Sequence, residues 1–253
     1  MKFLCGIPLV IVLLVIACGC TGPAVEPATT LTVTAVGTPI PASASEPLAE
    51  LSTTNPNASL TLDPGAVIMA FHAANPGKMT LTSSCGPDWG AYDDIDITSS
   101  YAGTLAFEIP ARGVCSFNLT GPAGWIAQVQ LPDAKAPLAV PVNLSGAGTL
   151  VSPSFTLEKG QYIFERKETG LASPEYAIRY ANGSYLMDAN NTVVQPGFGM
   201  ISDETFRIIN VPESGTYFLG VIARSNPAAW NASIQLMPVI PAMGPGPELT
   251  ATV

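Results

Sequence analysis

The chain has 253 residues, of which 47% are apolar and only 11% are charged, and its net charge is −9. A surface with so few charges must be built mainly from Ser, Thr, Asn, Gln, Gly and Pro, which is typical of secreted β-proteins rather than cytosolic enzymes. The ten Lys and Arg residues are scattered singly. Without a basic stripe to neutralise phosphates, we expect no nucleic-acid partner.

Residues 1–20 have the pattern of a signal peptide, with an apolar run from Phe3 to Ala17 that is short for a membrane span. The run ends in VIACGCTG, which resembles the lipobox of prokaryotic, archaeal-type lipoproteins, where a lipidated Cys becomes the mature N-terminus. Two cysteines fit this motif, and we favour Cys20 over Cys18. The alternative is a signal anchor without lipid. Both readings place the protein on the extracellular face of the cell membrane, and lipid anchoring also suits an acidic chain that anionic headgroups repel.

Residues 21–57 and 239–253 are rich in Pro, Ala, Thr and Ser and sustain no apolar period. Such segments cannot bury enough surface to offset the loss of conformational entropy. We therefore expect a disordered N-terminal linker that holds the folded part away from the membrane, and a flexible C-terminal tail.

Two parts of the remaining chain resemble each other. The segment GVCSFNLTGPAGWIAQVQL, from residue 113, is echoed by GTYFLGVIARSNPAAWNASIQL from residue 215, and SLTLDPGAVIMAF from residue 59 is echoed by SFTLEKGQYIFER from residue 154. A repeat of one domain's length predicts an internal duplication. We place the two units at residues 58–134 and 153–238, with a linker at residues 135–152 in which Leu138 to Val142 could add an edge strand to either unit.

Each unit consists of short β-rich runs separated by Gly, Pro, Asn and Asp, which predicts an all-β fold of two tandem antiparallel β-sandwiches of jelly-roll type. Apolar and polar residues alternate in both hairpins, so one face of each strand should be buried. Trp125 and Trp230 fall on this inward face and are expected in the cores. The same alternation places Leu131 and Leu236 inward.

Cys85 and Cys115 are the two cysteines outside the signal region, and in an oxidising compartment we expect them to form a disulfide. The chain also contains N-glycosylation sequons, which are candidate modification sites on a secreted protein. They lie at Asn57, Asn118, Asn143, Asn182, Asn190 and Asn231.

The segment PDWGAYDDID concentrates the candidate binding residues of the first unit. Its carboxylates could converge on a hard cation such as Ca²⁺, although a solvated acidic loop is the alternative. Nearby aromatic residues are candidate stacking platforms for a sugar if they are exposed on one rim. The acidic residues are Asp88, Asp93, Asp94 and Asp96, and the aromatic residues are Trp89, Tyr92 and Tyr101.

Catalytic motifs are mostly absent from the sequence. The one histidine, His72, reads as a surface residue at a strand end, and no His-rich zinc site, G-x-S-x-G or H-E-x-x-H motif occurs. We expect no cofactor apart from the Ca²⁺ candidate and classify the chain as non-enzymatic.

The repeated pattern of an F-x-L-x-x-G-x-Y strand and a G-x-Y-x-L-x-V hairpin resembles pre-peptidase C-terminal or carbohydrate-binding-like domains of secreted prokaryotic proteins. This resemblance implies an accessory binding or spacing module. We therefore expect a cell-surface binding or structural protein whose partner is an envelope glycan or an envelope protein. The alternative is an accessory or substrate-binding subunit of a surface enzyme or transporter complex.

Overall fold

The computed structural model describes residues 30–32, 46–86, 90–169, 174–188, 190, 192–194, 204–224 and 229–238. Within these residues all regular structure is β-strand, which confirms the predicted all-β class. No helix in this part of the chain is long and apolar enough to span a membrane. The signal region with Cys18 and Cys20, the C-terminal tail and most of the predicted tether lie outside the described residues.

The first sandwich consists of two four-stranded antiparallel sheets. Its inner sheet has the order β2 (Ala49–Ser52), β9 (Ile126–Gln130), β4 (Gly65–Ala73), β7 (Tyr101–Ile109). Its outer sheet has the order β3 (Asn57–Leu62), β8 (Gly113–Thr120), β5 (Gly77–Cys85), β6 (Gly90–Ile97). The core between them contains Met69, Phe71, Phe107, Phe117 and Trp125.

The second sandwich is built in the same way. Its outer sheet has the order β1 (Thr30–Thr32), β10 (Val142–Ala147), β17 (Ala229–Leu236), β13 (Gly160–Thr169), β15 (Glu204–Val211), in which only β1 and β10 pair in parallel. Its inner sheet joins β11 (Leu150–Val151), β16 (Gly215–Ile222) and β12 (Phe155–Leu157), and β14 (Glu175–Tyr180) also pairs with β16. The core contains Phe155, Phe164, Tyr176, Tyr217 and Trp230.

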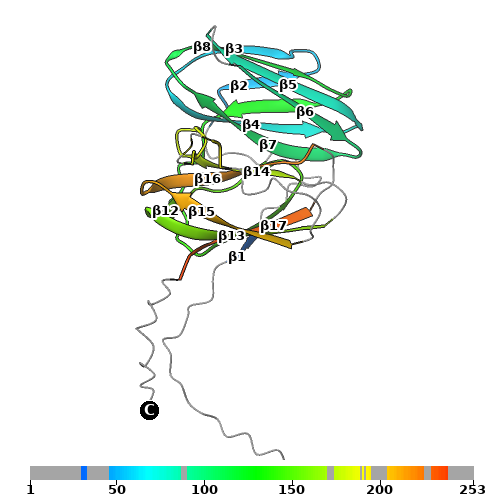
Figure 1. Cartoon of the computed structure of the whole chain (residues 1–253). Helices are drawn as coiled ribbons and strands as arrows, with labels where there is room; N and C mark the ends of the chain where they lie inside the picture. The colour runs from blue at the N-terminus through cyan, green and yellow to red at the C-terminus, as the bar shows by residue number, and fades with distance from the viewer. Residues whose placement is uncertain are drawn as a thin grey trace, which may run out of the picture.

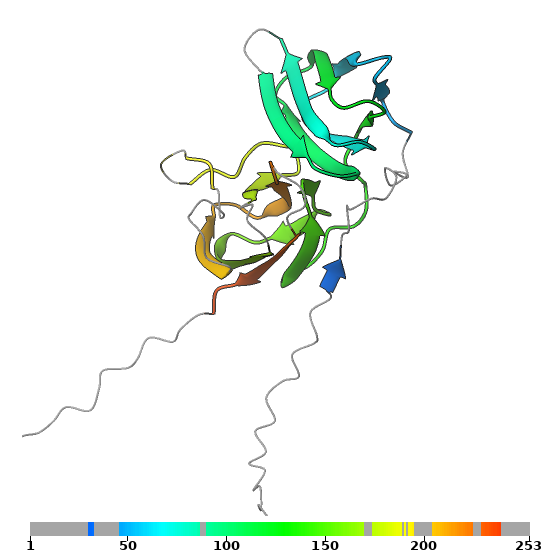
Figure 2. The same ribbon diagram turned by 90° about the vertical axis from the view of Figure 1, so that its right-hand side faces the viewer.

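The four sheets stack as layers, with the two inner sheets facing each other at the middle of the molecule (Figure 1). Figure 2 shows the first sandwich above the second from the side, with β1 beside the second. The outer sheet of the first sandwich therefore lies farthest from β1 and from the end of β17.

The two sandwiches share their strand order and the register of equivalent strand pairs. The inner sheet of the first sandwich, in the order β2-β9-β4-β7, corresponds to the outer sheet of the second, in the order β10-β17-β13-β15. Residues that match in the two sequence segments also form equivalent strand pairs. In the first sandwich these pairs are Leu62 with Gly113, Gly65 with Ile109 and His72 with Ile126. The equivalent pairs of the second are Leu157 with Gly215, Gly160 with Val211 and Lys167 with Asn231. The shared register is a property of the structure, and the duplication itself stays a prediction.

The boundaries differ from the expected ones at two places. Strands β1 and β2 lie within residues 21–57, the predicted linker, because β1 pairs with β10 and Leu51 of β2 is buried in the first core. Strands β10 and β11 lie within residues 135–152, because Leu144 and Leu150 are buried in the second. These short strands are flanked by Pro, Ser and Gly, which hide a two-residue period from a reading of composition.

The predicted alternation holds along both hairpins and fails at their ends. Trp125 is 2% exposed and Trp230 is 1% exposed, so both lie in the cores as expected. Leu131 and Leu236 were expected inward, but they are 51% and 59% exposed. Both lie at or just beyond the end of a strand, where no facing sheet remains to cover them.

Candidate functional site

The inner sheets meet through a small apolar contact. Phe218 of β16 is buried against Ala66, Ile68 and Ala106 of the first sandwich, and Val151 packs beside them. A side chain that points away from its own core yet is 4% exposed must be covered by another surface, and here that surface is the other sandwich. We call this contact and its hydrogen bonds the joint.

Tyr101 belongs to the joint and not to an exposed rim. Its side chain is fully buried, and its hydroxyl accepts a hydrogen bond from the backbone N–H of Thr149. The prediction that Tyr101 is a ligand-stacking platform is therefore wrong, because its ring packs against Phe71 in the core of the first sandwich and only its hydroxyl reaches the second. Trp89 and the side chain of Tyr92 lie outside the described part of the structure.

Backbone hydrogen bonds extend the joint along β7. Thr104 donates its backbone N–H to the carbonyl of Thr149 at 3.1 Å, and its hydroxyl accepts from the N–H of Val151 at 2.7 Å. Two glycines permit this approach, since a Cβ on Gly103 would overlap the Thr149 carbonyl and one on Gly148 would overlap the Tyr101 ring. Gly148 also has a φ of +73°, which favours glycine.

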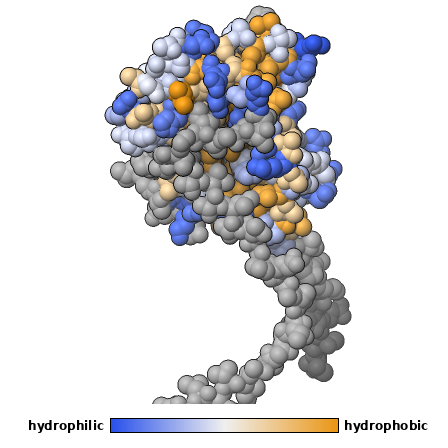
Figure 3. All heavy atoms as spheres, turned by 180° about the vertical axis from the view of Figure 1, so that it is seen from behind, coloured by the Kyte–Doolittle hydropathy of each residue, from blue (hydrophilic) through white to orange (hydrophobic). Residues whose placement is uncertain are grey.

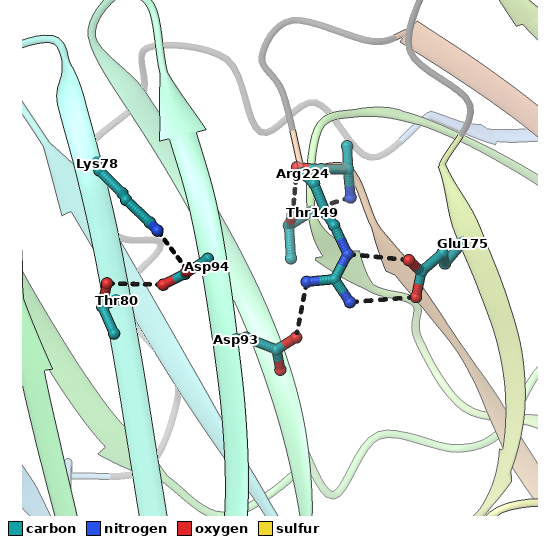
Figure 4. Close-up of polar contacts among 8 residues, drawn as sticks. Lys78, Thr80, Asp93, Asp94, Thr149, Glu175 and Arg224 are labelled. Carbon is teal, nitrogen blue, oxygen red and sulfur yellow. Dashed lines mark hydrogen bonds and ion pairs between the residues drawn. The ribbon is translucent and has the colours of Figure 1, made fainter.

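The acidic residues of β6 are separated onto two faces (Figure 4). Asp94 points to Lys78 and Thr80 of β5, at 2.5 and 2.7 Å. Asp93 points the opposite way, toward Arg224 of the second sandwich at 3.7 Å. Because neighbouring strand residues face opposite sides, these carboxylates do not converge. Among the described residues no three metal-binding side chains gather, and Asp88 lies outside them, so the Ca²⁺ site stays a prediction.

Arg224 connects the sandwiches at the edge of the joint. Its guanidinium contacts Glu175 at 2.9 and 3.4 Å, and its carbonyl accepts the backbone N–H of Asp96 at 2.8 Å. The hydrogen bond with Glu175 raises the pKa of Arg224. Burial raises the pKa of the Asp93 carboxyl, and the nearby Arg224 only partly offsets this. The joint therefore holds a carboxylate, that of Asp93, whose burial is only partly offset by the positive charge of Arg224.

A second arginine lies deeper in the joint. Arg179 donates to the carbonyl of Gly183 at 2.7 Å and stacks over Tyr185, 3.7 Å from the ring centre, and burial lowers its pKa. Asp93, Glu175 and Arg179 border a cavity of about 40 Å³ between the sandwiches. This volume suits a few water molecules and is too small for a substrate.

The predicted disulfide is confirmed. Cys85 and Cys115 are directly opposite each other on β5 and β8, with their Cα atoms 4.1 Å apart, and their sulfur atoms are bonded. The bond joins the two central strands of the outer sheet of the first sandwich. Its position on neighbouring strands, and not between sheets, was one of the two arrangements that the sequence allowed.

The sequons lie on the surface, and their modification stays a prediction. Asn57, Asn182, Asn190 and Asn231 are exposed, while Asn118 and Asn143 are half-buried. The Asn118 amide donates a hydrogen bond to the Asn57 side chain, since the two residues are opposite each other on β8 and β3.

The histidine shows no catalytic partner set in the described part of the chain. His72 is half-buried near the end of β4, and its Nε2 lies 3.5 Å from the hydroxyl of Ser100. No described carboxylate orients the ring, so the pair lacks the third member that activates a serine nucleophile.

A shallow hollow of about 450 Å³ lies on the outer sheet of the first sandwich, on the side away from the joint. Its lining comes from β3, β8 and β5 and contains Asn57, Ala58, Ser59, Thr82, Ser83, Ser84, Ser116, Phe117 and Asn118. Seen from behind, the first sandwich carries hydrophilic side chains interspersed with small hydrophobic patches (Figure 3). These Ser and Thr positions carry neither the charge nor the aromatic ring that marks a candidate site in a sequence.

Comparisons with known proteins leave the function open. No protein-family model matches the chain, and no curated protein matches it. Among solved structures, it is similar over 75% of its length to tripeptidyl peptidase 2, with 11% identity and a TM-score of 0.24. The chain spans 22% of that structure, and a similarity of this size carries no argument about activity.

Proposed function

We propose that this chain is a lipid-anchored, non-enzymatic binding protein on the outer face of the cell membrane, in which the two sandwiches act as one rigid unit. The joint is the observation that supports the rigid unit, and the sequence pattern of residues 1–20 supports the anchor. The joint combines the apolar contact of Phe218 with the backbone hydrogen bond between Thr104 and Thr149 and the ion pair of Arg224 with Asp93. A flexible linker would let the sandwiches turn independently, whereas these contacts fix their relative orientation.

The chain path supports display of the first sandwich away from the anchor. Strand β1 pairs with β10 in the outer sheet of the second sandwich, where Thr30 is opposite Asn143 and Asn143 is opposite Ser233. The segment that leads to the anchor therefore meets the second sandwich first. An extended linker of the length between Cys20 and Thr30 reaches roughly 30 Å, so the second sandwich is the one held near the membrane.

Lipid anchoring is tested by membrane fractionation and intact mass. We expect the wild-type chain and Cys18→Ser to remain in the membrane fraction with the mass of a lipid-modified N-terminus. Cys20→Ser should lose both properties. An unmodified wild-type chain that still stays in the membrane would show a signal anchor and contradict the predicted lipidation.

One observation favours the alternative of an accessory subunit. Phe206 and Ile208 of β15 are 70% and 54% exposed, and among the described strands β15 is an edge strand that pairs with β13. An apolar edge strand is a docking surface for another protein. Covalent cross-linking on intact cells checks this: a partner captured by wild type and lost in Phe206→Ser with Ile208→Ser supports the subunit function, with the exposed Val114→Ser as control.

A further inference from the structure

The hollow on the outer sheet of the first sandwich has a regular lining. Strand register places Asn57, Asn118 and Thr82 in one row across the sheet, and Ser59, Ser116 and Ser84 in the next. Strands are spaced about 4.8 Å apart, and residues on one face repeat about every 6.8 Å along a strand. The hollow therefore presents a grid of hydroxyl and amide groups within the volume range of small-molecule sites.

The chemistry of this lining selects a class of ligand. It contains no charged residue, although the chain carries a net charge of −9. Farther along the same face of β5 and β6, Lys78 pairs with Asp94, and the exposed Asp96 is opposite Lys78. Hydroxyl and amide side chains both donate and accept hydrogen bonds, as sugar hydroxyls do. An anionic or cationic ligand would find no counter-charge here, whereas a neutral polyhydroxylated one would find partners.

Several of these groups are available to a ligand. Among the described residues, the hydroxyls of Thr82 and Ser84 take part in no hydrogen bond, and the contact of Ser59 with Ser116 is long, at 3.3 Å. Binding exchanges their hydrogen bonds to water for hydrogen bonds to the ligand, so each group contributes modestly and affinity requires several of them together.

The base of the hollow is fixed before any ligand arrives. Cys85 follows Ser84 and Cys115 precedes Ser116, so the disulfide joins the two strands that carry the central hydroxyls. A covalent bond at this point holds the spacing of the grid and lowers the ordering cost of binding. The hollow also faces away from the joint and the anchored end, where a surface ligand can reach it.

We propose that this hollow binds a neutral saccharide, with Thr82, Ser84 and Ser116 as central hydrogen-bonding groups. This inference rests on the proposed function in that it names the ligand class of the displayed sandwich.

The test uses the full chain, isotope-labelled and made in a host without N-glycosylation so that Asn57 and Asn118 stay unmodified. Neutral trisaccharides of glucose, mannose and N-acetylglucosamine are titrated, and backbone amide shifts are followed by NMR. We expect at least one of them to shift amides of β3, β5 and β8, while a uronic-acid trisaccharide does not. Thr82→Val with Ser84→Ala should weaken binding about tenfold, which corresponds to about 1.4 kcal/mol.

Matched controls separate the hollow from the rest of the surface. Ser145→Ala with Ser233→Ala removes hydroxyls from the outer sheet of the second sandwich and should leave the affinity unchanged. Thr82→Ser keeps a hydroxyl and should retain most of the wild-type affinity. The inference is overturned if no neutral sugar shifts these strands, if the charged sugar binds equally, or if both double variants behave alike. Failure of the lipid-anchoring test would contradict the proposed function but would not change the outcome of the sugar titration.

Discussion

The two sandwiches share one architecture and are stabilised by different means. Their equivalent strands have the same order and the same register, yet the first contains the disulfide and the second has a cluster of aromatic rings. In that cluster Tyr176 makes edge contacts with Phe164 at 5.8 Å and with Trp230 at 6.1 Å. Strand and turn positions therefore determine this fold, and the core chemistry can be exchanged within it.

Removal of the core tryptophans should cause the largest loss of stability and the largest difference between the two sandwiches. Truncation of a buried Trp costs about 3 to 5 kcal/mol. We expect Trp230→Ala to cost more than Trp125→Ala, because Trp230 also donates from Nε1 to the carbonyl of Gly148 at 3.0 Å and anchors the aromatic cluster. Urea unfolding of both variants measures the difference. Equal losses would mean that the hydrogen bond and the ring contacts add nothing beyond burial.

The disulfide should matter to the first sandwich alone. Cys85→Ala with Cys115→Ala opens a loop with a sequence separation of 30 residues, and the chain-entropy account gives a loss of roughly 3 to 4 kcal/mol. Calorimetry of the full chain should show a lower transition for the first sandwich and an unchanged one for the second. A shift of both transitions together would show that the joint couples their unfolding.

The joint is the next target. In Gly148→Ala the new Cβ would overlap Tyr101, and the alanine would have to keep the positive φ of this position. We expect this strain to lower the free energy of unfolding by about 1 to 3 kcal/mol. The sandwiches should loosen, and small-angle scattering should show a larger radius of gyration. Gly113→Ala, where a Cβ meets nothing within 4 Å, is the control. An unchanged radius in both variants would contradict a joint that depends on this glycine.

The sequence carried enough information for the fold class, both core tryptophans and the disulfide, because these depend on local alternation and on cysteine number. It could not reveal the joint, since Tyr101, Thr149 and Phe218 acquire their roles only when two sheets meet. The hollow was missed for another reason. Ser and Thr on an outer strand face look like ordinary solvent-exposed residues until the register places them in rows.

The smallest expected effect concerns the charge at the joint. Burial raises the pKa of Asp93 above its ordinary value of 3.8, so the folded protein holds this proton more tightly than the unfolded chain does. The stability from this group is therefore present at low pH and is lost as the pH rises through the raised pKa. Asp93→Asn stays uncharged and should be more stable than wild type at neutral pH, by less than about 1 kcal/mol.

Thermal denaturation from neutral pH down toward pH 3.8 measures this gap, which should close as wild-type Asp93 takes up its proton. Asp96→Asn, on an exposed residue of the same strand, is the control and should show no gap. If Asp93→Asn is instead the less stable protein at neutral pH, attraction to Arg224 outweighs the burial of the carboxylate. The first sandwich would then be held to the second by charge as well as by packing, and salt should weaken the joint.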